Sequence, residues 1–567
     1  MYKVFWFSIG VVLLFLGCSS EEPMPELTVS QVSSESAFEA SRPNFLIITT
    51  DDMGYTDLGA FGGHDIPTPN LDGLAMQGVR LANFHVSASC APTRTMLMSG
   101  TGNHEGGMGT QRANEFGGYP GYERHIADRV LTMPERMSAA GYHTYMAGKW
   151  HLGTEAGVNL PNDRGYERSF ALLPGGFDHF KLPIGQEPPQ TGSSLPVPYT
   201  EDGVILDDIP EDFYSTNAYV DKMLVYLQSN EGDGQPFFAW FAPTAPHWPL
   251  QVLPDWKDRF VGNYDAGYDA LCVERQRNAL EAGVLPGGAD FSMCPEIADS
   301  WDELSEDDQA LHRRTMELYA AMTAHMDSEF GRILDYLEES GQLDNTYIIY
   351  SNDNGPQGGV PFTARSRMDR LNNELENLGN RDSWISIGQG WTDAQSAPFR
   401  GNKGSQFEGG IRVPAFIKAP NSAGAGQVSQ SLLTIMDVLP TVMDIAGIEE
   451  VSVSAEGSAV LPIRGKSFAG LLTDSTQAIH GADEYIALDL GGVSVLMQGS
   501  WKIVRPARSN DWLLFDTSVD PSETKDLSSE NPNLLAELAA KYEDHATATG
   551  IMRTPFIEVG RVDPGGG

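Results

Sequence analysis

The chain has 567 residues and a formal net charge of -40, with 77 Asp and Glu residues against 37 Lys and Arg residues. A surface this acidic repels nucleic acid and anionic membranes, so neither is expected as a partner. Hydrophobic residues make up 41% of the chain, and its length suits one large α/β domain with a smaller appendage.

The N-terminal region has the features of an export signal. An apolar run over residues 4–16 is too short for a membrane span but fits a signal-peptide core, which predicts a signal over residues 1–17. The run ends in small residues and a cysteine, so it resembles a bacterial lipoprotein signal in which Cys18 is lipidated and anchors the chain. Phe15 stands where Leu is usual, which leaves ordinary signal cleavage open. Residues 18–40 are rich in Ser, Glu and Pro and are predicted to be a flexible tether, so we expect an exported protein of the periplasm, outer membrane or cell surface.

Apolar strand-like runs then alternate with amphipathic stretches. Strands are predicted over residues 44–50, 236–242 and 347–351, and a helix over 432–445. A longer helix that ends at Gly341 is predicted from apolar residues spaced three and four apart, namely Tyr319, Met322, Met326, Phe330, Ile333 and Leu337. This alternation predicts an α/β fold with a large, mostly parallel mixed sheet sandwiched by helices.

The pattern changes after residue 478. Four short strand-like runs and a helical stretch from Pro532 predict a C-terminal α+β subdomain over 479–567, with a small antiparallel sheet, a packed helix and a loose glycine tail. Cys272 and Cys294 are available for a disulfide in an exported protein, and the sequence leaves open whether they pair.

Two oxygen-rich pairs directly follow predicted strands. Asp51 and Asp52 follow the first strand, and Asp353 and Asn354 follow a later one. Because ligands bind at the carboxyl ends of parallel strands, these pairs are expected to meet around a hard divalent cation. Calcium fits better than zinc, since neither His nor Cys lies beside the pairs, and magnesium is the close rival. The alternative is that both pairs only cap helices or form turns.

A cysteine stands at the start of a predicted helix in the segment SASCAPTRTMLMSG. Cys90 is followed by Pro92, which suits the first turn, and by Arg94 one turn on. A helix N-terminus and a nearby guanidinium lower the pKa of a thiol, so a reactive residue is predicted. The alternative is a small buried structural cysteine.

Three further segments carry cations and imidazoles. Lys149 and His151 flank Trp150 and would face the same side of an extended segment, which suits anion binding and proton transfer. His247 stands between two prolines just after a strand, and Lys403 stands in a Gly-rich loop. The alternatives are an ordinary loop histidine and a solvated lysine.

Taken together, these motifs resemble the formylglycine-dependent (type I) sulfatases of the alkaline-phosphatase-like superfamily. The Cys-x-Pro-x-Arg element and the segment GKWHLG resemble the two signatures of that family, and the remaining polar residues follow in its order. The resemblance runs from about Arg42 to the end and is strongest to bacterial arylsulfatases. Thr101 replaces an Arg of the first signature, as in that subgroup. A sulfatase catalytic domain is therefore expected over 41–478.

The resemblance implies a role for each residue. Cys90 would be oxidised to formylglycine by a formylglycine-generating enzyme, and one hydroxyl of the hydrated aldehyde would attack sulfur. Asp51, Asp52, Asp353 and Asn354 would hold Ca²⁺, or Mg²⁺ in its place. The other implied roles are charge stabilisation by Arg94 and Lys149, removal of the second hydroxyl proton by His151, and gripping of the sulfate with protonation of the leaving oxygen by His247 and Lys403.

The expected reaction is hydrolysis of sulfate monoesters, with aryl sulfates preferred from the subgroup resemblance. Sulfated sugars or polysaccharides are the alternative substrate, and the stretch over 358–398 is expected to set specificity. There are two rival functions. One is a phosphate or phosphonate ester hydrolase of the same superfamily, and the other is a binding lipoprotein that has lost catalysis.

Overall fold

The structure is a computed structural model, and it describes residues 42–110, 119–181, 197–289, 294, 299–358, 371–454, 457–507 and 509–552. The predicted signal over 1–17, the tether over 18–40 with Cys18, part of the 358–398 stretch and the C-terminal tail lie outside these residues. In the ranges that are described, no helix is both long enough and apolar enough to cross a membrane.

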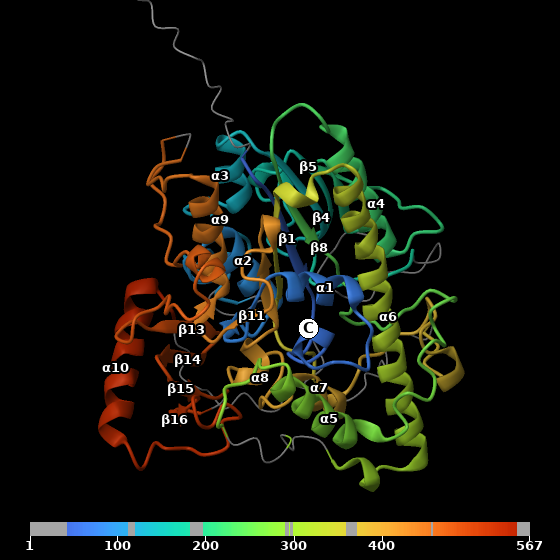
Figure 1. Cartoon of the computed structure of the whole chain (residues 1–567), viewed down its shortest axis with the longest axis vertical. Helices are drawn as coiled ribbons and strands as arrows, with labels where there is room; N and C mark the ends of the chain where they lie inside the picture. The colour runs from blue at the N-terminus through green and yellow to red at the C-terminus, as the bar shows by residue number, and fades with distance from the viewer. Residues whose placement is uncertain are drawn as a thin grey trace, which may run out of the picture. The chain divides into compact units, whose positions relative to one another are not determined.

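A large mixed sheet forms the centre of the fold (Figure 1). Its strands, in spatial order, are β11 (Gln427–Ser429), β2 (Val79–Leu81), β10 (Ala415–Lys418), β9 (Thr346–Asn352), β1 (Asn44–Thr50), β8 (Phe237–Ala242), β4 (His143–Lys149), β5 (Arg168–Leu172), β6 (Tyr199–Glu201) and β7 (Val204–Ile205). Strands β9, β1, β8, β4 and β5 run parallel, whereas β10, β6 and β7 run antiparallel to their neighbours. The predicted α/β class, with its mostly parallel sheet, is confirmed.

Helices cover both faces of this sheet, and β1 shows why. All seven of its residues are buried, and alternate side chains enter different cores: Leu46 and Ile48 enter one, Phe45 and Ile47 the other. The first core is closed by α1 (Pro69–Gln77), α4 (Ser215–Ser229), α5 (Gly267–Glu281), α6 (Glu306–Glu339) and α7 (Gln389–Ser396). The second is closed by α2 (Cys90–Ser99), α3 (Met133–Ala139), α8 (Glu408–Ile411) and α9 (Val438–Ala446). In Figure 1, α4 and α6 lie on one side of the strands, and α2, α3 and α9 lie on the other.

The two predicted helices fare differently. All six apolar residues predicted to form the buried stripe of the longer helix are buried in α6, whose N-cap Ser305 accepts a hydrogen bond from Asp308 N at 3.1 Å. The helix predicted over 432–445 begins too early. Leu433–Thr434 instead forms β12, which pairs with β3 (Phe84–His85), and one 3₁₀ turn leads into α9.

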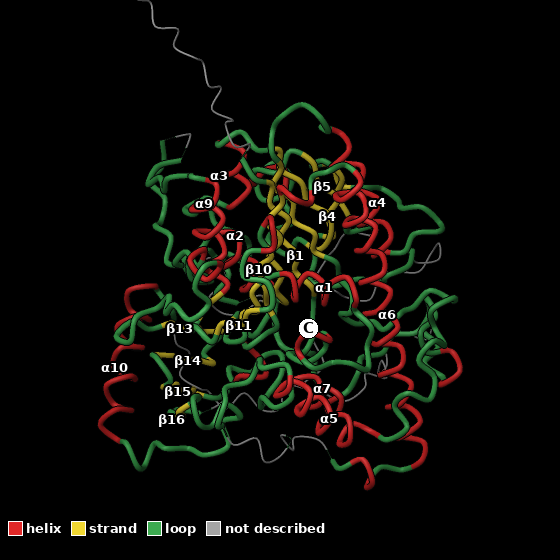
Figure 2. Tube along the Cα trace, viewed as in Figure 1, coloured by secondary structure: helices red, strands yellow, loops and turns green. Residues whose placement is uncertain are grey.

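A smaller antiparallel sheet and α10 (Pro532–Thr549) form the predicted C-terminal α+β unit (Figure 2). Its strands are β13 (Ile486–Leu490), β14 (Val493–Gln498), β15 (Trp501–Arg505) and β16 (Leu513–Asp516). One face packs on α10 through Leu538 and Tyr542, and the other places Val495 and Val504 in the core of α2 and α9. Cys272 and Cys294 form a disulfide, the pairing that the sequence left open.

Candidate active site

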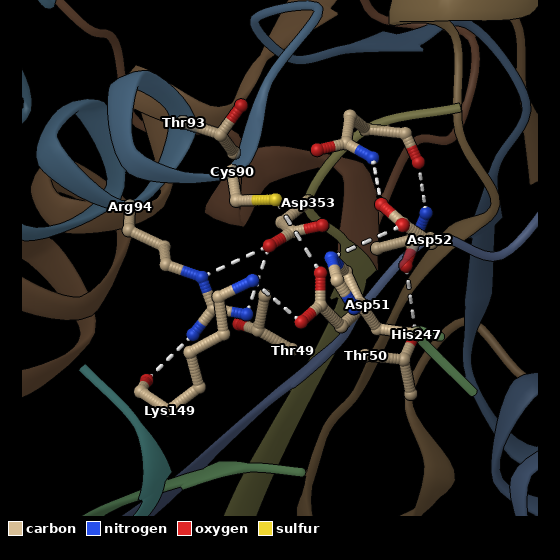
Figure 3. Close-up of polar contacts among 12 residues, drawn as sticks. Thr49, Thr50, Asp51, Asp52, Cys90, Thr93, Arg94, Lys149, His247 and Asp353 are labelled. Carbon is tan, nitrogen blue, oxygen red and sulfur yellow. Dashed lines mark hydrogen bonds and ion pairs between the residues drawn. The ribbon is translucent and has the colours of Figure 1, made fainter. Parts of the chain in front are cut away.

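The four predicted cation ligands meet at one edge of the large sheet. Strands β1 and β9 are parallel and in register, with Thr50 beside Asn352, so the residues that follow each strand emerge side by side. All four ligands, Asp51, Asp52, Asp353 and Asn354, are at least 97% buried. Asn354 Nδ2 donates to Asp52 Oδ1 at 2.7 Å, which joins the two pairs directly. The two predicted pairs therefore meet, and Figure 3 shows Asp51, Asp52 and Asp353 close together.

Helix α2 brings the cysteine to the same place. Cys90 is its first residue, as predicted, and its Sγ lies 3.4 Å from Asp51 Oδ1. One turn later, Arg94 donates to Asp353 Oδ2 from Nε at 2.9 Å and lies 2.8 Å from it through Nη2. Figure 3 shows both side chains directed toward the carboxylates. A single helical turn thus presents a thiol and a cation to the same carboxylate cluster.

The predicted lowering of the thiol pKa is wrong. Burial, and then the negative charge of Asp353, raise the pKa of Cys90 well above its usual range, and Lys149 offsets this only in part. The hydrogen bonds of the Arg94 guanidinium go to Asp353 and to the carbonyl oxygen of Lys149, at 2.6 Å from Nη1. The unmodified side chain is therefore a neutral thiol and a poor nucleophile.

Lys149 and His151 both reach the site, although not for the predicted reason. Lys149 ends β4 and its Nζ lies 2.6 Å from Asp51 Oδ2. His151 has a φ of 58°, so the segment is not extended and strand alternation does not orient it. Burial, and then the charge of Lys149, hold the pKa of His151 well below its usual value. Its Nδ1 is buried and has no hydrogen-bond partner in the part of the chain that the structure describes. A neutral imidazole of this kind can accept a proton.

His247 and Lys403 both approach Asp52. His247 Nε2 lies 3.5 Å from Asp52 Oδ2, and Lys403 Nζ lies 2.6 Å from Asp52 Oδ1. His247 Nδ1 lies 2.6 Å from the carbonyl oxygen of Trp248, which can only accept, so Nδ1 carries the hydrogen. Burial lowers the pKa of His247 to about 4, so its Nε2 is an unprotonated acceptor that faces a carboxylate oxygen. In the loop after Lys403, Gly404 N donates to Ala88 O at 2.7 Å, which ties this loop to the cysteine segment.

The oxygen atoms of this cluster fit a divalent cation. Three buried acceptors of the cluster have no hydrogen-bond partner among the described residues: Asp52 Oδ2, Asp353 Oδ1 and Asn354 Oδ1. Possible ligand atoms of Asp51, Asp52, Cys90 and His247 also lie within 4.8 Å of one another. Unpaired carboxylate and amide oxygens in a buried site are the donors that a hard cation needs. The donor set differs from the prediction in one respect. His247 and Cys90 also lie close enough to Asp51 and Asp52 to share a metal ion with them.

Three contacts near the site were not predicted. Gly175 and Gly176, which follow β5, lie against the rings of His151 and His247, and His179 Nε2 lies 3.0 Å from His247 O. The sequence signal was a glycine pair and a histidine within PGGFDH, directly after a strand.

Comparison with known proteins agrees with this geometry. A family model described as Sulfatase matches residues 43–448. The chain is 36% identical over 537 residues to an uncharacterized sulfatase of Schizosaccharomyces pombe, covering 91% of this chain and 96% of that one. It is also 36% identical over 442 residues to the arylsulfatase of Klebsiella aerogenes, covering 77% and 93%. The chain belongs to the type I sulfatase family.

A solved structure shows the same fold at lower identity. Ps i-CgsB in complex with k-i-k-neocarrahexaose superposes with a TM-score of 0.64 at 22% identity, over 89% of this chain and 93% of that chain. The fold is that of the alkaline-phosphatase-like sulfatases, as the sequence predicted.

Proposed function

We propose that this sulfatase hydrolyses aryl sulfate monoesters after Cys90 has been converted to formylglycine. The observation that carries the proposal is the packing of Cys90 Sγ against Asp51, inside a buried cluster of unpaired oxygens and fixed cations. Because the thiol itself is neutral and buried, an oxidised side chain is the better nucleophile at this position. The hydrated aldehyde supplies a hydroxyl nucleophile and, in its second hydroxyl, a means of releasing sulfate.

Asp51, Asp52, Asp353 and Asn354 would hold the cation, for which we propose Ca²⁺. The unpaired oxygens favour a hard ion, and when bound it supplies Lewis-acid polarisation of the sulfate. Mg²⁺ is the alternative, and the metal dependence of a chelated, refilled enzyme decides between the two.

Each of the other side chains around the cluster has its own role in the proposed reaction. Arg94 and Lys149 are fixed cations in a buried site, so they stabilise the negative charge that develops during sulfate transfer. His151 is neutral and takes up the proton of the second hydroxyl. At His247, the charge of a bound sulfate ester favours the protonated ring, whose Nε2 can then donate to the leaving oxygen. Lys403 holds the sulfate beside it.

Aryl sulfates are preferred because the Klebsiella relative, which shares 36% identity, is named an arylsulfatase. Sulfated sugars are the second candidate, because the structural neighbour Ps i-CgsB was solved with a bound saccharide. Matured enzyme should be compared on p-nitrophenyl sulfate, p-nitrophenyl phosphate and a set of sulfated sugars. Faster phosphate than sulfate turnover would reject the sulfatase proposal, and turnover of sugar sulfates alone would reject the aryl preference.

The same experiment needs two controls. Cys90→Ala should lower sulfate turnover by about 10³-fold or more, because the nucleophile is lost. Mass spectrometry of the peptide containing residue 90 should find the aldehyde after co-expression with a formylglycine-generating enzyme. An active enzyme whose Cys90 is unmodified would contradict the proposal.

We also propose that the chain is exported and anchored by a lipid on Cys18. The support is the sequence of residues 1–17 alone. Labelling of the wild type, but not of Cys18→Ala, with a radioactive fatty acid in the host tests this.

A further inference from the structure

The segment that follows β5 contacts both histidines of the site. The roles proposed above do not include this segment. A Cβ atom on Gly175 would lie 2.6 Å from Cε1 of His151, and a Cβ atom on Gly176 would lie 2.9 Å from Cε1 of His247. Both distances are too short for real contacts, so the two backbones limit how far each ring can move. Only glycine leaves room for the rings where they now stand.

A hydrogen bond from the same segment fixes the backbone of His247. His179 Nε2 lies 3.0 Å from His247 O, and its Nδ1 lies 2.7 Å from Ser215 Oγ. A carbonyl oxygen can only accept, so Nε2 carries the hydrogen and the neutral ring accepts from Ser215 at Nδ1. His179 N in turn donates to Oε1 of the buried Gln251 at 2.9 Å, which joins the segment to the loop of His247.

We infer that the segment from Gly175 to His179 is a positioning element that holds His151 and His247 in place for proton transfer. The inference rests on the proposed function, since it gives these histidines their roles. It predicts that a methyl group at position 175 or 176 displaces an imidazole rather than the fold, because the clashing atoms are the ends of side chains. A displacement of about 1 Å can lower a catalysed rate by about 100-fold.

Gly176→Ala is the central variant, and Gly287→Ala is its matched control, because Gly287 has no atom within 4 Å of an added Cβ. On a sulfate ester of a weakly acidic alcohol, we expect about a 10- to 100-fold lower kcat for Gly176→Ala, with an unchanged melting temperature. The control should match the wild type in both. If Gly176 acts through His247, the same change in a His247→Gln background should lower kcat by less than about two-fold. An unchanged kcat in Gly176→Ala, or a full additional loss in the double variant, would overturn the inference.

Variants of His179, and crystal structures of the glycine variants, provide two independent tests. His179→Gln keeps a donor for His247 O and should retain more activity than His179→Phe, which has none; equal activity would count against the inference. Crystal structures of Gly175→Ala and Gly176→Ala should show the imidazole of His151 or His247 displaced, and unmoved rings would refute the positioning role. An enzyme that turns over no sulfate ester would reject the proposed function, whereas the ring positions would still decide this inference.

Discussion

Lys502 Nζ lies 2.6 Å from Glu408 Oε1 and joins two parts of the chain that are 94 residues apart. Lys502 belongs to β15 of the small sheet, and Glu408 begins α8, shortly after the loop that carries Lys403. Lys502 also lies 2.8 Å from Glu523 Oε1, and all three side chains are at most 1% exposed. One buried ammonium therefore serves two carboxylates and supports the loop that places Lys403.

Lys502→Met should destabilise the fold by about 3–5 kcal/mol, because it removes the ammonium beside the buried Glu523 and one of the cations beside Glu408, which keeps Arg412. The free energy of unfolding in urea measures this loss. Lys525→Met is the control, since Lys525 is 65% exposed in its ion pair with Glu530, and it should change stability by about 1 kcal/mol or less. Equal losses of unfolding free energy in the two variants would show that the buried ion pairs of Lys502 contribute no more stability than an exposed one.

Asp52→Asn should strongly reduce stabilisation by calcium. Asp52 offers one unpaired oxygen to the site and binds Lys403 with the other. Calcium at about 100 times its Kd should stabilise the chelated wild type by about 2.7 kcal/mol, and the variant by much less. Calcium titration with thermal unfolding provides the measurement, and the exposed Asp544→Asn should respond as the wild type does. A variant with full calcium stabilisation would remove Asp52 from the ligand set.

His247→Gln should lower kcat by about 10²- to 10⁴-fold on sulfate esters of weakly acidic alcohols. The loss should be much smaller for p-nitrophenyl sulfate, because its leaving oxygen needs little protonation. Kinetics on a series of phenyl sulfates with different leaving-group pKa values provide the test. The exposed His64→Gln is the control, and a loss independent of the leaving group would assign His247 to sulfate binding alone.

His143 should make stability depend on pH. Burial opposes its charge, but hydrogen bonds to Glu167 and Asp233, each at 2.7 Å, raise its pKa above the usual 6.5. The stabilisation is therefore fully present below about pH 6.5 and is lost as pH rises through the higher pKa of the folded state. His143→Gln should destabilise the protein at pH 5.5 and have less effect at pH 9, as measured by urea unfolding. An equal effect at both values would contradict the ionic explanation.

The central part of the fold and of the site could be predicted from the sequence because local patterns determine it. Continuous apolar runs identify β1, β8 and β9, and the polar pairs that directly follow β1 and β9 had to meet once those strands were parallel. The protonation of Cys90 could not be predicted, because burial of the thiol and then the charge of Asp353 raise its pKa, and both depend on the tertiary fold. The beginning of α9 was missed for a similar reason, since β12 forms only by pairing with β3. The contacts of Gly175 and Gly176 likewise depend on the final fold.

The burial of α2 determines when Cys90 can be modified. All ten residues of the helix are buried, and Cys90 itself is 1% exposed beneath the loop that Gly404 ties to Ala88. In the folded protein the side chains of this helix are therefore inaccessible to a modifying enzyme. The proposed conversion of Cys90 would therefore have to occur before the chain folds, while this segment is still accessible. On the proposed mechanism, protein that folds with Cys90 unmodified would be inactive until it unfolds again.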